Sequence, residues 1–335
     1  MSYSEFLRAI RVRKSVNLVK LLTSYLISGI SQKIFFLGYP LTLSVELTNH
    51  CNLRCPECRS GSGLLGREKG FMEKTTFDRV LADCSSFLFS MIFYFQGEPF
   101  LHNELIEMIK KAKQKRLYTM TSTNGHFLDP DTAKKVVESG LDRIIISMDG
   151  LDQPVYEKYR IGGNLDMVKE GIEALVGWKK TLRSGTPVII IQFLVFSHNQ
   201  HQIEDVKKWS RSAGADGVEI KTALFHDFEN GNPLMPDEQY TRYRKNSDGK
   251  LVINSKLKNH CWQCWSKTVI TWDGNVLPCC FDTDGDYAMG NILKQPFIDI
   301  WKGIPYMAFR TKLLRNRKEI PMCRNCTEGV SYYIH

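Results

Sequence analysis

The stretch Cys51-Asn-Leu-Arg-Cys55-Pro-Glu-Cys58 places three thiols at a C-x₃-C-x₂-C spacing, directly after the apolar residues 41–47. Thiols this close together on a short loop can converge on one point. Structural zinc sites take four protein ligands and iron–sulfur clusters usually take four thiolates, but this loop supplies only three. A cubane bound by three thiolates keeps one iron open to a substrate or cofactor. The alternative is a structural zinc loop in which nearby His50 is the fourth ligand.

Composition limits the class of protein. The chain has 335 residues, of which 43% are hydrophobic and 24% charged, as in a globular protein, and its length favours two domains. Nine of the ten cysteines lie in groups, and Cys84 stands alone. Because no signal peptide is recognisable, these groups indicate metal or redox cofactors in a reducing cytoplasm rather than disulfides.

The formal net charge of +9 suits an anionic substrate, an acidic peptide or a membrane surface. No nucleic-acid partner is expected, because no aromatic residues interleave the basic run at residues 110–116. Residues 1–36 combine apolar positions at roughly helical spacing with arginines and lysines, which interrupt any run long enough to span a bilayer. We expect a helix packed on the main domain. The alternative is an interfacial helix on an anionic membrane.

From residue 41 onward, strand-like and helix-like segments alternate. The apolar or β-branched runs lie at 41–48, 91–96, 117–123, 143–148, 188–196 and 217–222, and amphipathic stretches lie near 75–89, 103–115, 131–139, 165–182 and 202–213. Strict alternation predicts a parallel α/β sheet, either doubly wound or a partial barrel, and periodicity does not distinguish the two. In both architectures ligands bind at the carboxyl ends of the strands.

Four short motifs fall at these carboxyl ends. The cysteine loop follows the first run, Gly97-Glu98-Pro99 the second, Asn124-Gly125 the third and Ser147-Met-Asp149-Gly150 the fourth. Turn chemistry explains any one of these motifs. Four of them on one edge of a sheet indicate a site.

The cysteine loop, preceded by Leu47-Thr48-Asn49, and the Gly97-Glu98-Pro99 motif resemble the radical S-adenosylmethionine (SAM) enzymes. The resemblance implies a partial (β/α)₆ TIM-like barrel over residues 41–225, with a [4Fe–4S] cluster on Cys51, Cys55 and Cys58. It implies that Gly97, Glu98 and Pro99 meet the methionyl amine of SAM, and that Asn124, Ser147 and Arg160 face its ribose and carboxylate. Glu57 departs from the family, which usually has an apolar or aromatic residue there, so only its backbone is expected to contact adenine.

A second cysteine group follows a polar, turn-rich segment at residues 226–260, which we interpret as a linker or substrate-side loop with His226 and Asp227 at the surface. The group comprises Cys261, Cys264, Cys279, Cys280, Cys323 and Cys326. The sequence between them predicts a β-hairpin that turns at Asp273-Gly274 and carries Cys264 and Cys279 on adjacent strands. Two cysteine pairs can provide the four ligands of a structural zinc site or of a [4Fe–4S] cluster.

Residues 261–335 resemble the SPASM or shorter twitch extension of radical SAM enzymes, in which a cysteine is followed by a glycine such as Gly274 and then by a cysteine such as Cys279. The resemblance implies a small β-hairpin and helix domain with one auxiliary [4Fe–4S] cluster. Its ligands would be Cys279, Cys323, Cys326 and either Cys261 or Cys264. We expect Cys84 and Cys280 to be buried small hydrophobic residues.

Together these resemblances imply an enzyme that reductively cleaves SAM to a 5′-deoxyadenosyl radical, which abstracts hydrogen from a substrate carbon. The expected outcome is the oxidation or modification of a small molecule (sugar-like or lipid-linked) or of a peptide. A one-electron donor such as flavodoxin or ferredoxin is expected, in the cytoplasm or peripheral to the membrane through residues 1–36. The expected segments are 1–40, 41–225, 226–260 and 261–335. The alternatives are a non-catalytic iron–sulfur electron-transfer protein and a zinc-binding module.

Overall fold

The computed structural model describes residues 12–255, 257–326, 328 and 333–334. Residues 1–11 of the predicted N-terminal segment therefore lie outside the described residues. The chain forms two compact units. The first unit consists of Met1–His50, Leu65–Thr121 and Leu257–Arg324, and the second consists of Cys51–Leu64, Ser122–Lys256 and Asn325–His335.

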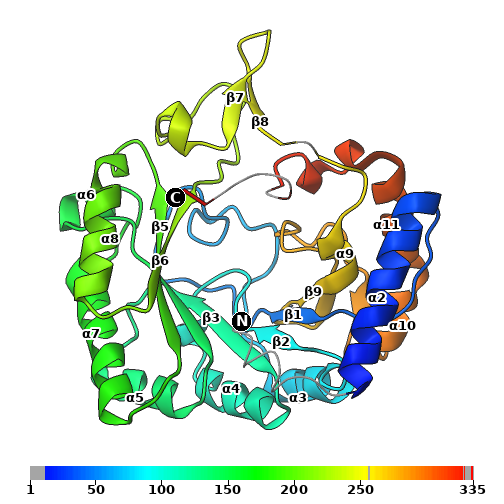
Figure 1. The fold of residues 1–335 in the computed structure, drawn as a ribbon, viewed down its shortest axis with the longest axis horizontal. Coiled ribbons are helices and arrows are strands. Elements are labelled where there is room, and N and C mark those ends of the chain that lie inside the picture. Colours follow the sequence, from blue (N-terminus) through cyan, green and yellow to red (C-terminus); the bar gives the residue numbers. More distant parts are fainter. Residues whose placement is uncertain (1–11, 256, 327, 329–332, 335) are drawn as a thin grey trace. The chain divides into compact units, whose positions relative to one another are not determined.

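The first unit is built around β-strands, of which Figure 1 labels β1, β2, β3 and β9. In sheet order these strands are β11 (Gly290–Asn291), β10 (Asn275–Leu277), β9 (Lys267–Ile270), β1 (Thr42–Val45), β2 (Ser90–Ile92) and β3 (Tyr118–Thr123). β1 pairs in parallel with β2 on one side and with β9 on the other, where Thr42 is opposite Lys267. Leu43 and Val45 are fully buried, so β1 is a central strand of this unit.

The helices of the first unit lie beside these strands. They are α2 (Val12–Ser31), α3 (Lys74–Cys84), η1 (Pro99–Leu101), α4 (Leu105–Gln114), α9 (Trp262–Ser266), α10 (Phe297–Lys302), α11 (Ile304–Asn316), η4 (Arg317–Glu319) and η5 (Pro321–Cys323). In α3 the buried residues Phe77, Val80, Leu81 and Cys84 recur at the three- and four-residue spacing of one helix face. The prediction that Cys84 is a buried small hydrophobic residue is thus confirmed.

The second unit has a parallel arrangement of its own. Its elements are α5 (Pro130–Glu138), β4 (Arg143–Ser147), α6 (Gln153–Glu157), α7 (Leu165–Thr181), β5 (Val188–Val195), η2 (Gln200–Gln202), α8 (Ile203–Ser212), β6 (Gly217–Thr222), η3 (Glu238–Tyr240), β7 (Tyr243–Lys245) and β8 (Leu251–Ile253). β5 pairs in parallel with both β4 and β6. The isoleucine runs at 144–146 and 189–191 are buried on both faces of these strands, as is typical of parallel sheets.

The predicted alternation of strands and helices is confirmed by β1–β6 and by α3, α4, α5, α7 and α8. The segment at residues 226–260 contains more structure than predicted, because β7 and β8 pair antiparallel with Tyr243 opposite Ile253. The Asn246 side chain closes the turn between them by accepting the N–H groups of Asp248 and Lys250. His226 and Asp227 are exposed, as expected.

The predicted hairpin is present as β9 and β10, with Gly274 at a φ of +84° in its turn. The prediction that Cys264 and Cys279 lie on its strands is wrong. Cys279 follows β10, which ends at Leu277. Cys264 lies in α9, a single helical turn that ends before β9 begins. The strand starts only where the β-branched residues Thr268, Val269 and Ile270 begin, which explains the difference.

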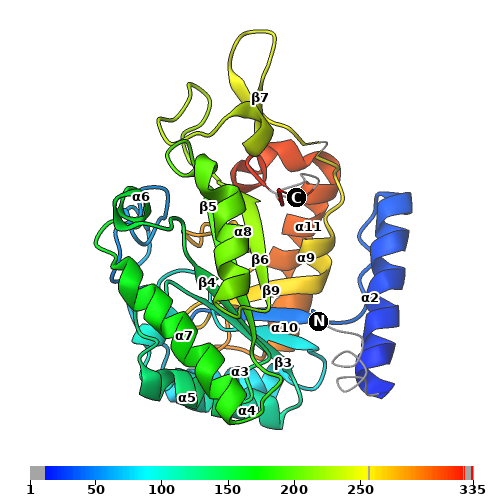
Figure 2. The same ribbon diagram turned by 60° about the vertical axis from the view of Figure 1, so that its left-hand side comes forward.

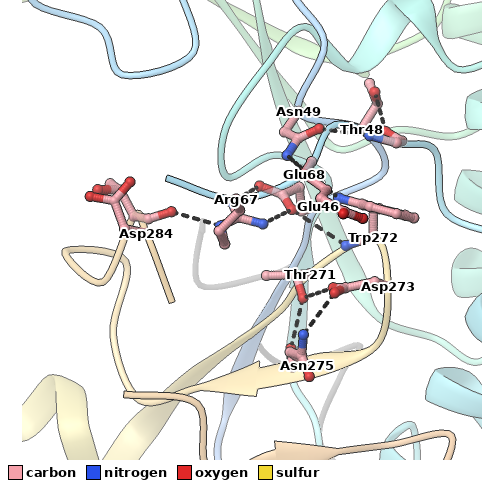
Figure 3. A network of polar contacts seen from close by, with 12 residues as sticks. Glu46, Thr48, Asn49, Arg67, Glu68, Thr271, Trp272, Asp273, Asn275 and Asp284 are labelled. Carbon is pink, nitrogen blue, oxygen red and sulfur yellow. Dashed lines mark hydrogen bonds and ion pairs between the residues drawn. The ribbon is translucent and has the colours of Figure 1, made fainter. Parts of the chain in front are cut away.

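A buried ion pair connects three segments of the first unit (Figure 3). The fully buried Glu46 accepts two hydrogen bonds from Arg67, at 2.9 and 2.7 Å. Glu46 lies just after β1, and its carboxylate also accepts the N–H of Trp272 in the hairpin turn at 3.4 Å. Arg67 donates from Nε to the Thr283 carbonyl at 2.8 Å. The chain that follows the cysteine loop is therefore fastened to both β1 and the C-terminal hairpin region.

Candidate functional site

The three cysteines of the first group lie on one loop of the second unit. Cys55 is buried in an apolar cluster that includes Leu53, Tyr159, Phe196, Phe225 and Tyr243. Cys51 and Cys58 are half-buried and pack against the same cluster. The loop turns back on itself, since the N–H of Cys58 donates to the Cys55 carbonyl at 3.2 Å. All three thiols are thus held at the edge of one apolar core.

Nitrogen donors approach two of these sulfurs. Nδ2 of the buried Asn124 lies 4.0 Å from Sγ of Cys51 and donates to Oδ1 of Asn52 at 2.7 Å. Nη1 of Arg160 lies 3.9 Å from Sγ of Cys55. Burial raises the pKa of the Cys55 thiol, and the positive charge of Arg160 opposes that rise. The loop therefore offers thiol ligands with compensating N–H groups, which suits an anionic iron–sulfur cluster.

Arg160 is positioned by the carboxylate of Asp149, which belongs to the fourth of the predicted motifs but has no role of its own in the sequence analysis. Asp149 is fully buried after β4, and its Oδ2 accepts from Nε of Arg160 at 2.6 Å. The other oxygen, Oδ1, accepts the N–H of Leu194 at 2.7 Å. Because Asp149 engages Nε and Nη2, Nη1 is the guanidinium nitrogen beside Cys55. An aspartate at the carboxyl end of a strand was the sequence signal for this residue.

The Glu57 carboxylate has a structural role, which explains why this residue differs from the one usual in the family. Its carboxylate accepts the N–H of His226 at 3.0 Å and Nδ2 of Asn232 at 2.8 Å. The cysteine loop therefore anchors the polar segment that follows β6. Nothing in the local sequence indicates this contact, since the partners are 169 and 175 residues apart.

The Gly97-Glu98-Pro99 motif lies in the first unit. It contacts the backbone of Thr48 and His50, which precede the cysteine loop. Gly97 has a φ of +76°, and a Cβ there would lie 2.6 Å from the carbonyl oxygens of Thr48 and His50, so only glycine fits. Glu98 is buried; its N–H donates to the His50 carbonyl at 2.8 Å and its Oε1 accepts the N–H of Phe100 at 3.1 Å. The ring of His50, the fourth ligand of the zinc alternative, stacks on Phe71.

The predicted SAM contacts are divided between the two units. Asn124, Ser147 and Arg160 belong to the second unit, as do the three cysteines, and Gly97-Glu98-Pro99 belongs to the first. Ser147 is buried at the carboxyl end of β4.

Five cysteines of the second group lie in the first unit, four of them proposed ligands and the fifth Cys280. Cys261 is the N-cap residue of α9, Cys264 lies within α9, Cys279 follows β10 and Cys323 ends η5. Cys261 acts electrostatically on Cys279, and Cys323 on Cys264, so these thiols are neighbours. Burial raises the pKa of Cys264 to about 11.

The remaining cysteines differ in their surroundings. Cys326 is buried and belongs to the second unit, where it accepts the N–H of Glu328 at 3.4 Å. The prediction that Cys280 is buried is wrong: its side chain is exposed. The reason is the turn after Cys279, closed by the N–H of Asp282 donating to the Cys279 carbonyl at 3.1 Å. Within the described ranges, no three Cys, His, Asp or Glu side chains are arranged to hold a single metal ion.

Sequence reasoning missed a buried cation beside the second cysteine group. Arg310 of α11 is fully buried, and its guanidinium carbon lies 3.7, 4.3 and 4.4 Å from the ring centroids of Phe36, Trp301 and Tyr306. Nη1 donates to the Trp301 carbonyl at 3.0 Å, whereas Nε and Nη2 have no hydrogen-bond partner among the described residues. Arg310 interacts electrostatically with Cys264, and burial lowers the Arg310 pKa to about 10.

This arrangement fits an iron–sulfur cluster. Buried N–H donors that lack partners are costly, and the sulfides and thiolates of a cluster would accept from them. A net negative cluster would also compensate the charge of the guanidinium. Because an arginine in an amphipathic helix normally points to solvent, no sequence pattern distinguishes Arg310 from a surface residue.

Two family models match the chain. Residues 45–209 match the radical SAM superfamily, and residues 261–327 match the SPASM iron–sulfur cluster-binding domain. Among curated relatives, a probable GTP 3′,8-cyclase of Methanococcus aeolicus is 30% identical over 269 residues, covering 72% of this chain and 86% of the relative. The chain belongs to the radical SAM superfamily and carries a SPASM domain. The first domain implies a [4Fe–4S] cluster and SAM, and the second implies auxiliary iron–sulfur binding.

Two further relatives cover most of the chain. One is the tungsten-containing aldehyde ferredoxin oxidoreductase cofactor-modifying protein of Pyrococcus furiosus, 26% identical over 314 residues, with 85% of this chain and 86% of the relative covered. The other is the PqqA peptide cyclase of Gluconobacter oxydans, 26% identical over 306 residues, with 86% and 82% covered. The prediction of a radical SAM enzyme is confirmed.

Solved structures share the fold. Streptococcus suis SuiB bound to S-adenosylmethionine has a TM-score of 0.65 at 14% identity, covering 87% of this chain and 73% of that one. BtrN in complex with AdoMet and 2-DOIA has a TM-score of 0.57 at 20% identity, covering 89% and 100%. The predicted fold class, a TIM-like radical SAM barrel followed by a SPASM-type domain, is confirmed.

Proposed function

We propose that Cys51, Cys55 and Cys58 hold the [4Fe–4S] cluster to which SAM binds. The observation that supports this most strongly is the placement of the three thiols against one apolar cluster, with Asn124 and Arg160 nitrogens near two of the sulfurs. When cluster and SAM are bound and one electron arrives, this chemistry supplies a 5′-deoxyadenosyl radical that takes hydrogen from a substrate carbon. The donor of that electron would be a protein such as flavodoxin or ferredoxin.

Residues of the second unit would orient the cofactor. Nη1 of Arg160 would face the methionyl carboxylate, because Asp149 holds the rest of the guanidinium still. Asn124 and Ser147, buried at the ends of β3 and β4, would contribute hydrogen bonds to the carboxylate and ribose. Glu57 would contact adenine only through its backbone, since its carboxylate anchors residues 226–232. The amine contacts of Gly97, Glu98 and Pro99, and the four predicted segment boundaries, stay predictions.

The substrate would be a small molecule, sugar-like or lipid-linked, or a peptide, and the reaction its oxidation or modification. Relatives support both classes: a peptide is the substrate in the name of the PqqA peptide cyclase, and GTP is that of the probable 3′,8-cyclase. The net charge of +9 favours anionic members of either class.

The test uses anaerobically reconstituted full-length protein with dithionite and SAM, supplied with perdeuterated amino-sugar, lipid-linked-sugar and peptide pools. We expect 5′-deoxyadenosine to form and to carry deuterium from one of these pools. Cleavage of SAM without deuterium transfer from any pool would contradict the proposed substrate classes. Full iron content without SAM cleavage would instead support the electron-transfer alternative.

We also propose that Cys279, Cys323 and either Cys261 or Cys264 bind the auxiliary cluster, with Arg310 donating hydrogen bonds to it. The two unpartnered nitrogens of Arg310 and its interaction with Cys264 support this assignment. Cys326 as a further ligand stays a prediction.

Arg310→Met is expected to make electron addition to the auxiliary cluster harder, because it removes a buried positive charge beside it. A tenfold change in the one-electron equilibrium corresponds to a midpoint potential about 60 mV more negative. The measurement is an EPR-monitored titration in a Cys55→Ser background, where the auxiliary cluster alone contributes. Arg310→Lys keeps the charge and serves as the control. An unchanged potential in Arg310→Met with full auxiliary iron would refute the proposed contact.

A further inference from the structure

Helix α2 is built the opposite way to an ordinary surface helix, because its inward face is largely polar. Nδ2 of Asn17 donates to the Tyr39 carbonyl at 3.0 Å, and its Oδ1 accepts the Tyr39 N–H at 2.7 Å. Two serines on the same face donate to the carbonyls of Leu37 and Phe35, Ser24 at 3.2 Å and Ser28 at 2.8 Å. These bonds hold α2 against the extended residues 35–39. The apolar side chains in this contact are the fully buried Leu21 and the half-buried Tyr25, whose ring stacks on His260 with centroids 3.7 Å apart.

The outward face of α2 is aliphatic. Its exposed fractions are Val12 81%, Val16 46%, Val19 63%, Leu22 41%, Leu26 58%, Ile27 40% and Ile30 85%. At 3.6 residues per turn these side chains share an arc of about 140° along five turns of the helix. Figures 1 and 2 show α2 at the periphery of its unit, with one long side facing no other helix or strand among the residues that the structure describes. A contiguous exposed apolar face of this size indicates an interaction site.

Charge on α2 is of one sign only. The helix contains no Asp or Glu, and its exposed Arg13 and Lys20 lie along one edge of the aliphatic arc. Lys33, just beyond the helix, is also exposed. Lys14 is turned inward instead, donating to the Arg116 carbonyl at 3.3 Å. The surface that complements this face must therefore be apolar and negatively charged.

One occupant other than a membrane surface, a second copy of this chain, fits less well. A second copy of α2 would bring further arginines and lysines to the rim of the contact and no carboxylate to pair with them. No helix in the described part of the chain is both long and apolar enough to cross a membrane. An anionic lipid surface satisfies both requirements, since acyl chains accept the aliphatic residues and phosphates pair with the basic edge.

We propose that the outward face of α2 docks the enzyme on an anionic membrane surface. The helix would lie in the plane of the interface, with Val12, Val19, Leu26 and Ile30 at the level of the acyl chains and Arg13 and Lys20 at the level of the phosphates. This placement is independent of the substrate, and it would bring the enzyme to lipid-linked substrates where those are its targets.

The test is co-sedimentation of the full-length, cluster-loaded protein with vesicles of phosphatidylcholine and phosphatidylglycerol, and with vesicles of phosphatidylcholine alone. We expect binding to the anionic vesicles, weakened at least tenfold on phosphatidylcholine alone. Binding is also expected to fall between about 0.1 M and about 1 M salt, where the Debye length shortens from about 10 to about 3 Å. Absence of wild-type binding to anionic vesicles would overturn the proposal.

Variants separate the two components of the surface. Val19→Gln/Leu26→Gln is expected to weaken vesicle binding at least tenfold, and Arg13→Gln/Lys20→Gln to weaken it and flatten its salt dependence. Ile304→Gln is the matched control, because Ile304 is an aliphatic residue 85% exposed on a different helix, α11. Retained SAM cleavage would show that each variant is folded. If Val19→Gln/Leu26→Gln instead dissociates a dimer and leaves vesicle binding unchanged, a second copy is the occupant and the proposal is wrong.

Discussion

Cys55→Ser is expected to abolish SAM cleavage completely while leaving the auxiliary iron in place. Cys55 is the most buried thiol of its loop, and its sulfur is the one that Nη1 of Arg160 approaches, at 3.9 Å. A serine hydroxyl in that position stays protonated and is a poor ligand for iron. With two thiolates left, the loop cannot hold a cubane, so no open iron remains for SAM.

The measurement is the iron and sulfide content together with the yield of 5′-deoxyadenosine. Two [4Fe–4S] clusters correspond to about eight irons per chain, and the variant should retain about four. Cys280→Ser is the matched control, because Cys280 is exposed and stands outside the proposed ligand sets; it should keep both the full iron content and SAM cleavage. SAM cleavage by Cys55→Ser, or an iron content unchanged from wild type, would show that this loop does not bind the cluster as proposed.

The parts of the fold that the sequence predicts well are those in which local pattern and environment agree. The isoleucine runs at 144–146 and 189–191 lie in β4 and β5 because both faces of these strands are buried. β7 and β8 escape detection because three-residue strands carry too little periodicity, and their turn is held by the Asn246 side chain. The pairing of β9 with β1 is non-local, and no window of sequence contains both partners.

The residues of the candidate site likewise differ in whether the sequence predicts them. The cysteine spacing and Gly97 could be predicted because each depends on local geometry, such as the close approach of Gly97 to the backbone of Thr48. The Asp149–Arg160 pair and the aromatic cage of Arg310 could not, because they depend on side chains brought together by folding. Whether a charged side chain is buried can be determined only when the residues packed around it are known.

Arg160→Met is expected to destabilise the second unit strongly, because it leaves the fully buried Asp149 without its cation. Breaking a buried ion pair from one side typically costs about 3–5 kcal/mol, which corresponds to a fall of about 10 °C in melting temperature. Arg244→Met is the control, since Arg244 is exposed on β7, and it should change stability by less than about 0.5 kcal/mol. Thermal unfolding followed by circular dichroism under anaerobic conditions provides the measurement.

The loss of stability in Arg160→Met should depend on pH. Burial raises the pKa of Asp149, and Arg160 opposes that rise. Without Arg160 the folded-state pKa rises further above the unfolded value, so the variant loses stability as the pH increases from the unfolded-state pKa to the folded-state pKa. The difference in the free energy of unfolding between wild type and variant should therefore be smaller at acidic than at neutral pH. A difference in unfolding free energy that increases on acidification would contradict this explanation.

The double variant Asp149→Asn/Arg160→Met separates stability from catalysis. The introduced asparagine side chain would carry no charge and could still accept the N–H of Leu194, so most of the lost stability should return. SAM cleavage should not return, because the guanidinium beside Cys55 is still missing. If cleavage recovers with stability, Arg160 supports the fold and has no part in orienting SAM. If neither recovers, the pair is not the source of the destabilisation.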